Sequence, residues 1–463
     1  MRRVLDRRCT KKELIVAIII IAIRFSFFSM LTLYTLSGDS AEYIEVSSLN
    51  ILKGNLHARR VPVYCFILDA VKYVCNIVTN SEDFYLFVVV IIQMLFSYVS
   101  VYLIYDTLKM FITNRNICLG IVLLYGISPS VIGWDKIILT ESLALSGTVV
   151  FIWLLAKYLK QPNTKIGLSV NILTVVLIFL RPTFLINYCV LFVFWLIRFV
   201  MYKSERSILR YNLICSLGIG IFILGYAGKF YSQYEIFTLS ATKVQQDCIT
   251  VVQQSLWGKN TEDIDVIAAI IENNSFEDEN GCINAARKVL ESYSFQRVEK
   301  FVSNSIKTDF VGYMSHKLRT IFLLGDIEIA NNVWYGKNVY SARTMYYEGD
   351  LPLYSIKNTD EMRKMVNIYR NIIPEPCFIH IYIVALAEII NVIWGGLKKK
   401  DVWFHLGLAS FMTLIVLSSV WGTCGEWGRT AICVLPYFYI SCGLCIQWLY
   451  DRIKNKILAE KEL

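Results

Sequence analysis

The chain has 463 residues, of which 56% are hydrophobic and only 18% are charged, and its mean hydropathy is +0.49. Soluble domains carry about 25% charged residues and lack long apolar runs, so this composition excludes an ordinary soluble protein. The formal net charge of +9 would suit a nucleic-acid-binding protein. Its basic residues, however, lie in short loops between apolar runs, which is typical of a membrane protein and speaks against nucleic acid as a partner.

Ten apolar segments are long enough to be membrane helices, because a bilayer core of about 30 Å is crossed by roughly 20 residues of α-helix. A helix satisfies its own backbone hydrogen bonds in lipid, so we predict an all-α, polytopic membrane bundle. The expected spans are residues 13–34, 84–106, 116–133, 138–157, 166–180, 183–200, 211–229, 377–396, 402–420 and 431–449.

The distribution of Lys and Arg predicts the orientation of the bundle. Both chain ends are basic, and so are the loops 109–115, 157–165, 198–210 and 398–400. With ten spans all of these segments fall on one side, which the positive-inside rule makes cytoplasmic. We therefore predict a multi-pass protein of the plasma membrane with both termini in the cytoplasm. The first apolar run is too long for a cleaved signal peptide.

The spans divide the chain into three parts. Residues 1–230 form an N-terminal transmembrane module, whose first outer loop covers 35–83. Residues 231–376 form a large outer loop, and residues 377–463 hold the last spans and a cytoplasmic tail. A loop as long as 231–376 is uncommon without a role, such as a lid that binds an acceptor; a structural plug over the bundle is the alternative.

Both outer loops are expected to contain helices. From Pro62 to Val78, apolar residues recur at helical spacing, which predicts an amphipathic helix lying flat on the membrane. A short re-entrant or buried helix is the alternative. In the second loop, Thr261 is expected to cap a helix with an acidic first turn, and further helices are expected over 283–300 and 303–324.

Ionisable side chains inside or beside membrane spans are costly, and this makes them candidates for function. Arg24 and Glu388 lie within predicted spans, where structural pairing is the alternative reading. Charges of both signs gather at the outer ends of other spans, where they could bind a phosphate and a hydroxyl substrate; snorkelling or structural pairs are the alternative. These residues are Asp39, Glu42, Asp135, Lys136, Glu141, Arg181, Glu426 and Arg429.

Several of these charges lie in short motifs that follow one another along the chain. The motifs are Arg24 in the first span, Gly38-Asp39, Arg60-Val61-Pro62-Val63-Tyr64, Thr140-Glu141-Ser142-Leu143, Arg181-Pro182-Thr183, and Gly425-Glu426-Trp427-Gly428-Arg429 before Pro436. Their order and shared outer location resemble integral-membrane glycosyltransferases of the GT-C class. The resemblance is greatest to bacterial relatives of the protein O-mannosyltransferases and of the lipid A aminoarabinose transferase. Many members have Asp-Glu where this chain has Asp39-Ser40.

The resemblance implies transfer of a sugar from a polyprenyl-phosphate donor to an acceptor hydroxyl of a lipid, glycan or protein at the outer face. Asp39 would be the general base, with Glu42 as a second carboxylate. Arginine suits the donor phosphate, because its planar fork binds phosphate oxygens in pairs. The phosphate-binding candidates are Arg60, Arg181 and Arg429. The supporting candidates are Glu141, Glu426 and Arg24.

No cofactor is expected with certainty. A divalent metal stays open, although the four histidines, His57, His316, His380 and His405, are far apart in the sequence.

Two other function classes stay open. A polymerase or ligase of lipid-linked polysaccharide would concentrate polar residues in the large outer loop, where Arg287, Arg297, Arg319 and Arg343 lie. A transporter of lipid-linked oligosaccharides is expected to show repeat symmetry and broken spans in matching halves.

Overall fold

The computed structural model describes residues 10–29, 33–36, 39–46, 48–260, 262–273, 279–322, 376, 378–394, 399–422 and 427–462. Within these ranges the chain is helical and contains no strand, which confirms the all-α prediction. The long helices are α1 (Lys11–Ser29), α5 (Glu82–Leu108), α6 (Arg115–Ile127), α8 (Glu141–Lys160), α9 (Thr164–Leu180), α10 (Leu185–Met201), α11 (Arg206–Tyr234), α20 (Phe378–Trp394), α21 (Lys399–Gly422) and α23 (Leu435–Glu462).

Six helical stretches in the described part of the chain are long and apolar enough to cross a membrane. They include α5 and α8, together with the stretches that contain α10, α11, α21 and α23. Three shorter apolar helices, α6, α9 and α20, lie among them. Together with α1, these helices give each predicted span one long helix, while the number of ten crossings stays a prediction.

The boundaries of three predicted spans are wrong. The span expected over 13–34 ends early, because α1 stops at Ser29 and residues 33–34 are not helical. The span expected over 116–133 ends early, because α6 stops at Ile127 and a separate turn, α7, covers Pro129–Ile132. Helical backbone angles are disfavoured for the residue before a proline, and Ser128 has a ψ of 124°, outside the helical range. The span expected from residue 138 begins instead at Glu141, which leaves residues 133–140 as a buried loop.

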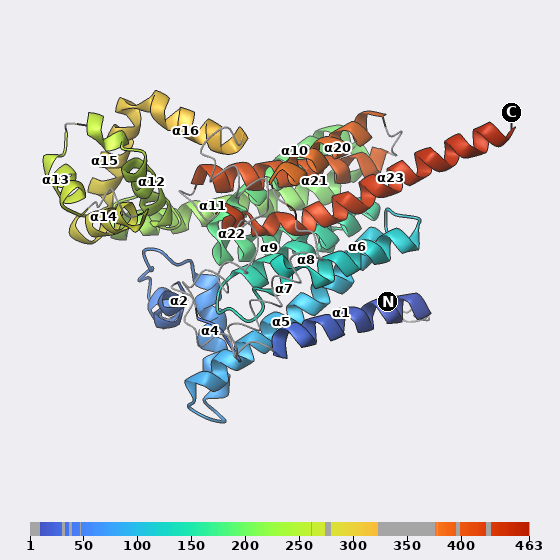
Figure 1. Ribbon diagram of the computed structural model, residues 1–463, viewed down its shortest axis with the longest axis horizontal. Coiled ribbons are helices and arrows are strands. Elements are labelled where there is room, and N and C mark those ends of the chain that lie inside the picture. The colour runs from blue at the N-terminus through green and yellow to red at the C-terminus, as the bar shows by residue number, and fades with distance from the viewer. Residues whose placement is uncertain are drawn as a thin grey trace.

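Figure 1 shows the long helices running side by side along the longest axis of the molecule. Helix α1 begins and α23 ends at the same end of the bundle, and helices α12–α16 lie at the opposite end. This arrangement agrees with termini that share one side of the membrane. Which side is cytoplasmic stays a prediction from the basic loops.

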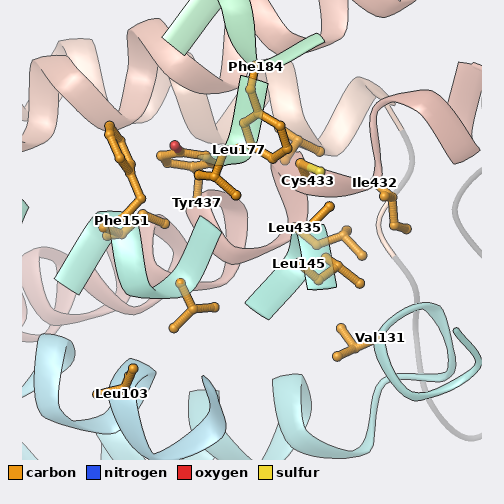
Figure 2. Close-up of a cluster of buried hydrophobic side chains, with 14 of the residues drawn as sticks. Leu103, Val131, Leu145, Phe151, Leu177, Phe184, Ile432, Cys433, Leu435 and Tyr437 are labelled. Carbon is orange, nitrogen blue, oxygen red and sulfur yellow. The ribbon is translucent and has the colours of Figure 1, made fainter. Parts of the chain in front are cut away.

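Figure 2 shows the apolar core where α8, α9 and the start of α23 meet. Leu145 and Leu177 are each 2% exposed there, and Leu435 is fully buried. Close packing of this kind stabilises helix–helix contacts in lipid, where the hydrophobic effect does not drive association. Two short helices join this core, η2 (Pro182–Phe184) and η6 (Ile432–Val434). The charged residues that begin or precede these elements are Glu141, Arg181 and Arg429.

The second outer loop forms a small helical domain with its own core, in which Val251, Val289 and Phe301 are buried. That core also takes in Phe230 of α11 and Leu56 of the first outer loop, so it is continuous with the base of the bundle. Its helices are α12 (Thr242–Gln253), α13 (Ile264–Asn273), α14 (Glu279–Ser292), α15 (Phe295–Thr308) and α16 (Phe310–Phe322).

The helix boundaries expected in this domain are partly wrong. The helix expected over 283–300 is two helices, because Ser294 interrupts it and its hydroxyl caps α15 by accepting from the N–H of Arg297 at 3.3 Å. The helix expected over 303–324 is likewise split at Asp309. Thr261 lies outside the described residues, and α13 begins at Ile264.

The first outer loop contains three helices. Helix α4 begins at Pro62, as predicted, since proline suits the first helical position. One face is buried through Tyr64 and Leu68, whereas Tyr73 and Val74 near its end are 76% and 61% exposed. The packed face agrees with the buried-helix alternative, and contact of the exposed end with lipid stays a prediction. The helices are α2 (Ser40–Glu45), α3 (Ser48–Leu52) and α4 (Pro62–Cys75).

Candidate functional site

Asp39, the predicted general base, lies between two arginines. Nη2 of Arg60 donates to its Oδ1 at 2.8 Å, and Nη2 of Arg429 donates to its Oδ2 at 2.5 Å. Each carboxylate oxygen therefore has its own guanidinium, one from the first outer loop and one from the segment before α23. The Asp39 side chain is 35% exposed, against 12% for Arg60 and 18% for Arg429. Of the three, Asp39 is the side chain most open to an approaching substrate.

A second carboxylate, Glu141, joins Arg429 to Arg181. Its Oε1 accepts from Nε of Arg429 at 2.7 Å and lies 3.3 Å from Nη1 of Arg181. Nη2 of Arg181 also donates to the backbone carbonyl of Arg429 at 3.4 Å. The Glu141 side chain is only 1% exposed, so two guanidinium groups balance its charge in place of water. Glu141 therefore holds two of the three arginines that were predicted to bind phosphate.

The third carboxylate, Glu42, completes the hydrogen bonding of the Arg60 fork. Its Oε2 accepts from Nε of Arg60 at 2.7 Å, and its Oε1 lies 3.1 Å from Nη2 of Arg59. The guanidinium carbon of Arg60 also lies 4.7 Å from the centroid of the Tyr43 ring, which is within range of a cation–π contact. We call the connected charges the outer ion network. Its members are Asp39, Glu42, Glu141, Arg59, Arg60, Arg181 and Arg429.

The outer ion network has four arginines and three carboxylates, which gives a net charge of +1 (4 − 3). Burial raises the pKa of Asp39, but the charges of Arg429 and Arg60 outweigh burial and hold this pKa at about 2. Burial lowers the pKa of Arg60, but the Tyr43 phenol and the carboxylates of Asp39 and Glu42 raise it by more, so the net shift is upward. Asp39 and Arg60 are therefore charged at neutral pH, and the surplus positive charge favours an anionic ligand.

The loop before α8 fixes the backbone on both sides of Asp39. An isolated parallel bridge pairs Thr35 with Ile137. The N–H of Ile138 donates to the Thr35 carbonyl at 3.0 Å, and the Ser40 hydroxyl donates to the Ile138 carbonyl at 2.9 Å. The segment that carries Asp39 is thus attached to the same loop that leads into Glu141.

Arg59 and Arg60 are positioned from the other side, by the end of α11 and the segment after it. These residues bind the backbone of residues 54–59, so the two arginines follow the base of the outer domain. The bonds run from Gln233 Nε2 to the Gly54 carbonyl (2.8 Å), from the Leu56 N–H to Gln233 Oε1 (3.0 Å), from the Tyr234 hydroxyl to the Leu56 carbonyl (2.6 Å), from the Ala241 N–H to the Ala58 carbonyl (2.7 Å), and from the Ser240 hydroxyl to the Arg59 carbonyl (2.8 Å).

Arg24, which was predicted to support the site, belongs to a different cluster. It is fully buried, and its Nε donates to the Gly126 carbonyl at 2.7 Å. Its Nη1 donates to the Ser97 hydroxyl at 2.9 Å and lies 3.7 Å from the Asp135 carboxylate. Burial raises the pKa of Asp135 to about 6, even though Arg24 opposes this shift. The geometry matches the structural pairing that was the alternative for Arg24.

The remaining candidates lie apart from the outer ion network or outside the described residues. Glu388 pairs with His405 inside the bundle, as its structural alternative expects. Lys136 donates to the Phe28 carbonyl at 2.8 Å. Arg297 pairs with Asp263 at 2.7 Å and with Asp265 at 2.9 Å on the outer domain. Arg287 is exposed on α14. Glu426, Arg343 and the side chain of Arg319 are not among the described residues.

The described residues contain no group of three or more His, Cys, Asp and Glu side chains that could hold a metal ion. The carboxylates of the outer ion network face guanidinium groups. His57, the nearest histidine in sequence, uses its Nδ1 to accept from the N–H of Arg60 at 3.0 Å. A divalent metal therefore gains no support from the described geometry.

Sequence reasoning missed two residues that organise the site. Arg59 was passed over because it precedes the better motif match, Arg60. Gln93 was passed over because it carries no charge, yet its amide lies fully buried beneath the loop before α8. A signal for it was present, since Gln93 is the single amide side chain in the apolar segment 84–106.

No family model matches the chain, and no curated protein matches it. Among solved structures, it is similar to the oligosaccharyltransferase of Archaeoglobus fulgidus in the apo form. It is similar to the same degree to the archaeal oligosaccharyltransferase AglB of that organism in complex with an inhibitory peptide and a dolichol-phosphate. In both cases the identity is 11%, the TM-score is 0.49, and the match covers 97% of this chain and 52% of the other. The chain thus spans about half the length of these enzymes, and a likeness at this level does not carry an activity over to it.

Proposed function

We propose that this chain is an integral-membrane glycosyltransferase of the GT-C type, which transfers a sugar from a polyprenyl-phosphate donor to an acceptor hydroxyl at the outer face of the membrane. The observation that carries the proposal is the place of Asp39 between Arg60 and Arg429, at 2.8 and 2.5 Å. Both arginines, and Arg181 beyond them, come from the motifs that resemble this enzyme class. A partly exposed carboxylate beside several guanidinium groups suits a reaction that needs a base and an anion site together.

The arginines have the role of binding the donor phosphate. Arg429 and Arg181 share Glu141, so their guanidinium groups are held close together in spite of their like charges. Two such groups can hold a phosphate through paired, charge-assisted hydrogen bonds. They also stabilise the negative charge that grows on the phosphate oxygen as the bond from the sugar breaks.

Asp39 has the role of general base. The acceptor oxygen attacks the anomeric carbon, its proton passes to a carboxylate oxygen of Asp39, and the lipid phosphate leaves with the electron pair of the broken bond. A carboxylate with a pKa of about 2 is a weak base. A bound phosphate competes with Asp39 for Arg429 and Arg60, and losing these partners raises the pKa of Asp39. Donor binding would therefore activate the base.

Sugar transfer tests the proposal directly. Purified protein is given a radiolabelled polyprenyl-phosphate sugar, and wild type is compared with Asp39→Asn, with donor binding measured in parallel. Asparagine keeps the shape of the side chain but cannot accept the proton. We expect transfer to fall by about 10²- to 10⁴-fold, the usual contribution of a general base, while the donor still binds.

A matched control is Glu82→Gln, which removes an exposed carboxylate from the outer start of α5, away from the outer ion network. This variant is expected to transfer sugar like the wild type. Equal transfer by wild type and Asp39→Asn would remove Asp39 from the mechanism and leave Glu42 as the carboxylate to test. No transfer by wild type with any donor would contradict the proposal and favour the polymerase or the transporter.

A further inference from the structure

Gln93 of α5 uses its whole side-chain amide inside the protein. Its Oε1 accepts from the Tyr64 hydroxyl at 2.8 Å. Its Nε2 donates to two backbone carbonyls, those of Asp135 at 3.0 Å and Ile137 at 2.9 Å. The residue is fully buried in an apolar membrane helix, where an amide is unfavourable unless it is hydrogen-bonded. Three partners from two other chain segments meet this requirement.

The two carbonyls belong to the loop before α8, which is hydrogen-bonded to the segment that carries Asp39. Ile137 forms the bridge with Thr35, and the next residue, Ile138, bonds to both Thr35 and Ser40. Asp39 precedes Ser40 directly. The Gln93 amide is therefore bonded to the loop before α8, and this loop holds the separate segment that carries Asp39.

The Tyr64 hydroxyl connects the same amide to Arg60. The Tyr64 ring packs edge-on against Tyr43 at 5.2 Å, and the Tyr43 ring lies 4.7 Å from the guanidinium carbon of Arg60. Tyr64 is fully buried, so its position is fixed by these contacts. The Gln93 amide is thus hydrogen-bonded both to the loop that holds the Asp39 segment and to Tyr64, whose ring packs against the Tyr43 ring beside Arg60.

We propose that Gln93 is a positioning residue, which sets the place of Asp39 relative to Arg60 by tying the loop before α8 to α4. This inference rests on the proposed glycosyl transfer, because that reaction requires Asp39 to be held in one position. A base has to stand within hydrogen-bond reach of the proton that it removes. A misplacement of about 1 Å can cost about 10²-fold in rate, even when its cause lies away from the chemistry.

The test uses Gln93→Met, which keeps the size of the side chain but cannot form the three hydrogen bonds. With the full-length protein we expect kcat for sugar transfer to fall by about 10- to 10²-fold, while KM for the donor changes by less than about threefold. The second readout is hydrogen exchange of the amides in residues 33–46 and 134–141. We expect faster exchange there, because the Thr35–Ile137 bridge loses its support.

The control is Thr107→Val in the same helix. Thr107 is equally buried, but its hydroxyl donates to the Leu103 carbonyl of its own helix, at 2.8 Å, and to no other element in the described part of the chain. This variant is expected to keep both kcat and the exchange rates. If Gln93→Met does not fold, Tyr64→Phe removes one of the three bonds, and a smaller fall in kcat together with faster exchange in the same segments is expected.

Unchanged kcat in Gln93→Met would overturn the proposal. So would a fall in kcat with unchanged exchange, because Gln93 would then act in another way. Failure of the proposed function is recognised separately, by the absence of transfer in the wild type. In that case the exchange measurement still decides whether Gln93 fixes the loop around Asp39.

Discussion

Asp39 and Arg429 are 390 positions apart in the sequence, yet their side chains form an ion pair of 2.5 Å. The same guanidinium donates through its Nε to Glu141 at 2.7 Å. Arg429 therefore joins the first outer loop, the start of α8 and the segment before α23. Because these segments are distant in the chain, the outer ion network exists only once the whole bundle has assembled.

Arg429→Lys is expected to abolish most activity although it keeps the charge. A lysine ammonium is a compact point charge and cannot reproduce the two separate contacts of the guanidinium fork. Glu141 would lose the closer of its two guanidinium partners and keep Arg181 alone, so its buried charge would be less completely balanced. We expect a fall in transfer of about 10²-fold or more and a lower unfolding temperature, measured by the transfer assay and by thermal unfolding in detergent.

The matched control is Arg297→Lys, because Arg297 also pairs with two carboxylates on the outer side but lies outside the outer ion network. It is expected to transfer sugar at the wild-type rate. Full activity in Arg429→Lys would show that the bridging geometry of Arg429 has no part in transfer.

The sequence was informative about the site because charges are rare in membrane proteins. Asp39, Arg181 and Arg429 could be selected as charges at the outer ends of predicted spans, and Arg60 through the motif in which it lies. The structure brings all four together. Their pairing could not be predicted, since it depends on which helix ends meet. Gln93 was missed for a related reason: a neutral amide costs less in lipid than a charge and looks like an ordinary helix residue.

The fold was predictable at the level of helices, because runs of apolar residues define them. The errors came where local chemistry interrupts such a run. Pro129 ends the span expected over 116–133, and Ser294 divides the helix expected over 283–300. Hydrophobic residues recur on both sides of each point, so their spacing alone does not reveal the interruption.

Asp135 is expected to give the protein a pH-dependent stability. Its folded pKa of about 6 lies above the ordinary value of 3.8. The folded state therefore holds this proton more tightly, and the resulting stability is present at low pH and is lost as the pH rises from about 4 to about 6. Asp135→Asn cannot titrate. We expect the unfolding temperature of wild type, relative to this variant, to fall over that pH range and to stay level above it.

The measurement is thermal unfolding of both proteins in the same detergent at closely spaced pH values. The expected difference is at most about 3 kcal/mol in unfolding free energy. A relative unfolding temperature that rises with pH over this range would contradict the assignment, because it would mean that Arg24 lowers the pKa of Asp135 by more than burial raises it.

Gln233 is expected to couple the outer domain to the site. Its amide accepts from the Leu56 N–H at 3.0 Å and donates to the Gly54 carbonyl at 2.8 Å, just before the segment that carries Arg60. Gln233→Met removes both bonds, at a cost of roughly 1–3 kcal/mol. We expect faster hydrogen exchange in residues 54–60 and a lower rate of transfer.

Gln253→Met serves as the control, because Gln253 is exposed on α12 of the outer domain. It is expected to leave both measurements unchanged. If Gln233→Met exchanged like wild type in residues 54–60, the coupling between the outer domain and Arg60 would have to run through other contacts.

The turn between α4 and α5 is expected to enter the outer leaflet of the membrane. It projects from the bundle in Figure 1, at the lower left. Ile77 and Val78 at its tip are 76% and 77% exposed. Tyr73, near the end of α4, is also 76% exposed. Apolar side chains that are this exposed outside the spans are unfavourable in water and favourable in the interfacial region of a bilayer.

A nitroxide label at Ile77→Cys tests this placement, in a background where the native cysteines, including the exposed Cys189, are replaced by Ser. In lipid nanodiscs we expect relaxation by oxygen, which concentrates in lipid, to exceed relaxation by a water-soluble nickel chelate. A label at Lys53→Cys is the control, since Lys53 is an exposed polar position of the same outer loop, and there the chelate should dominate. Dominance of the chelate at position 77 as well would place the turn in water. The exposed apolar tip would then require a protein partner in place of lipid.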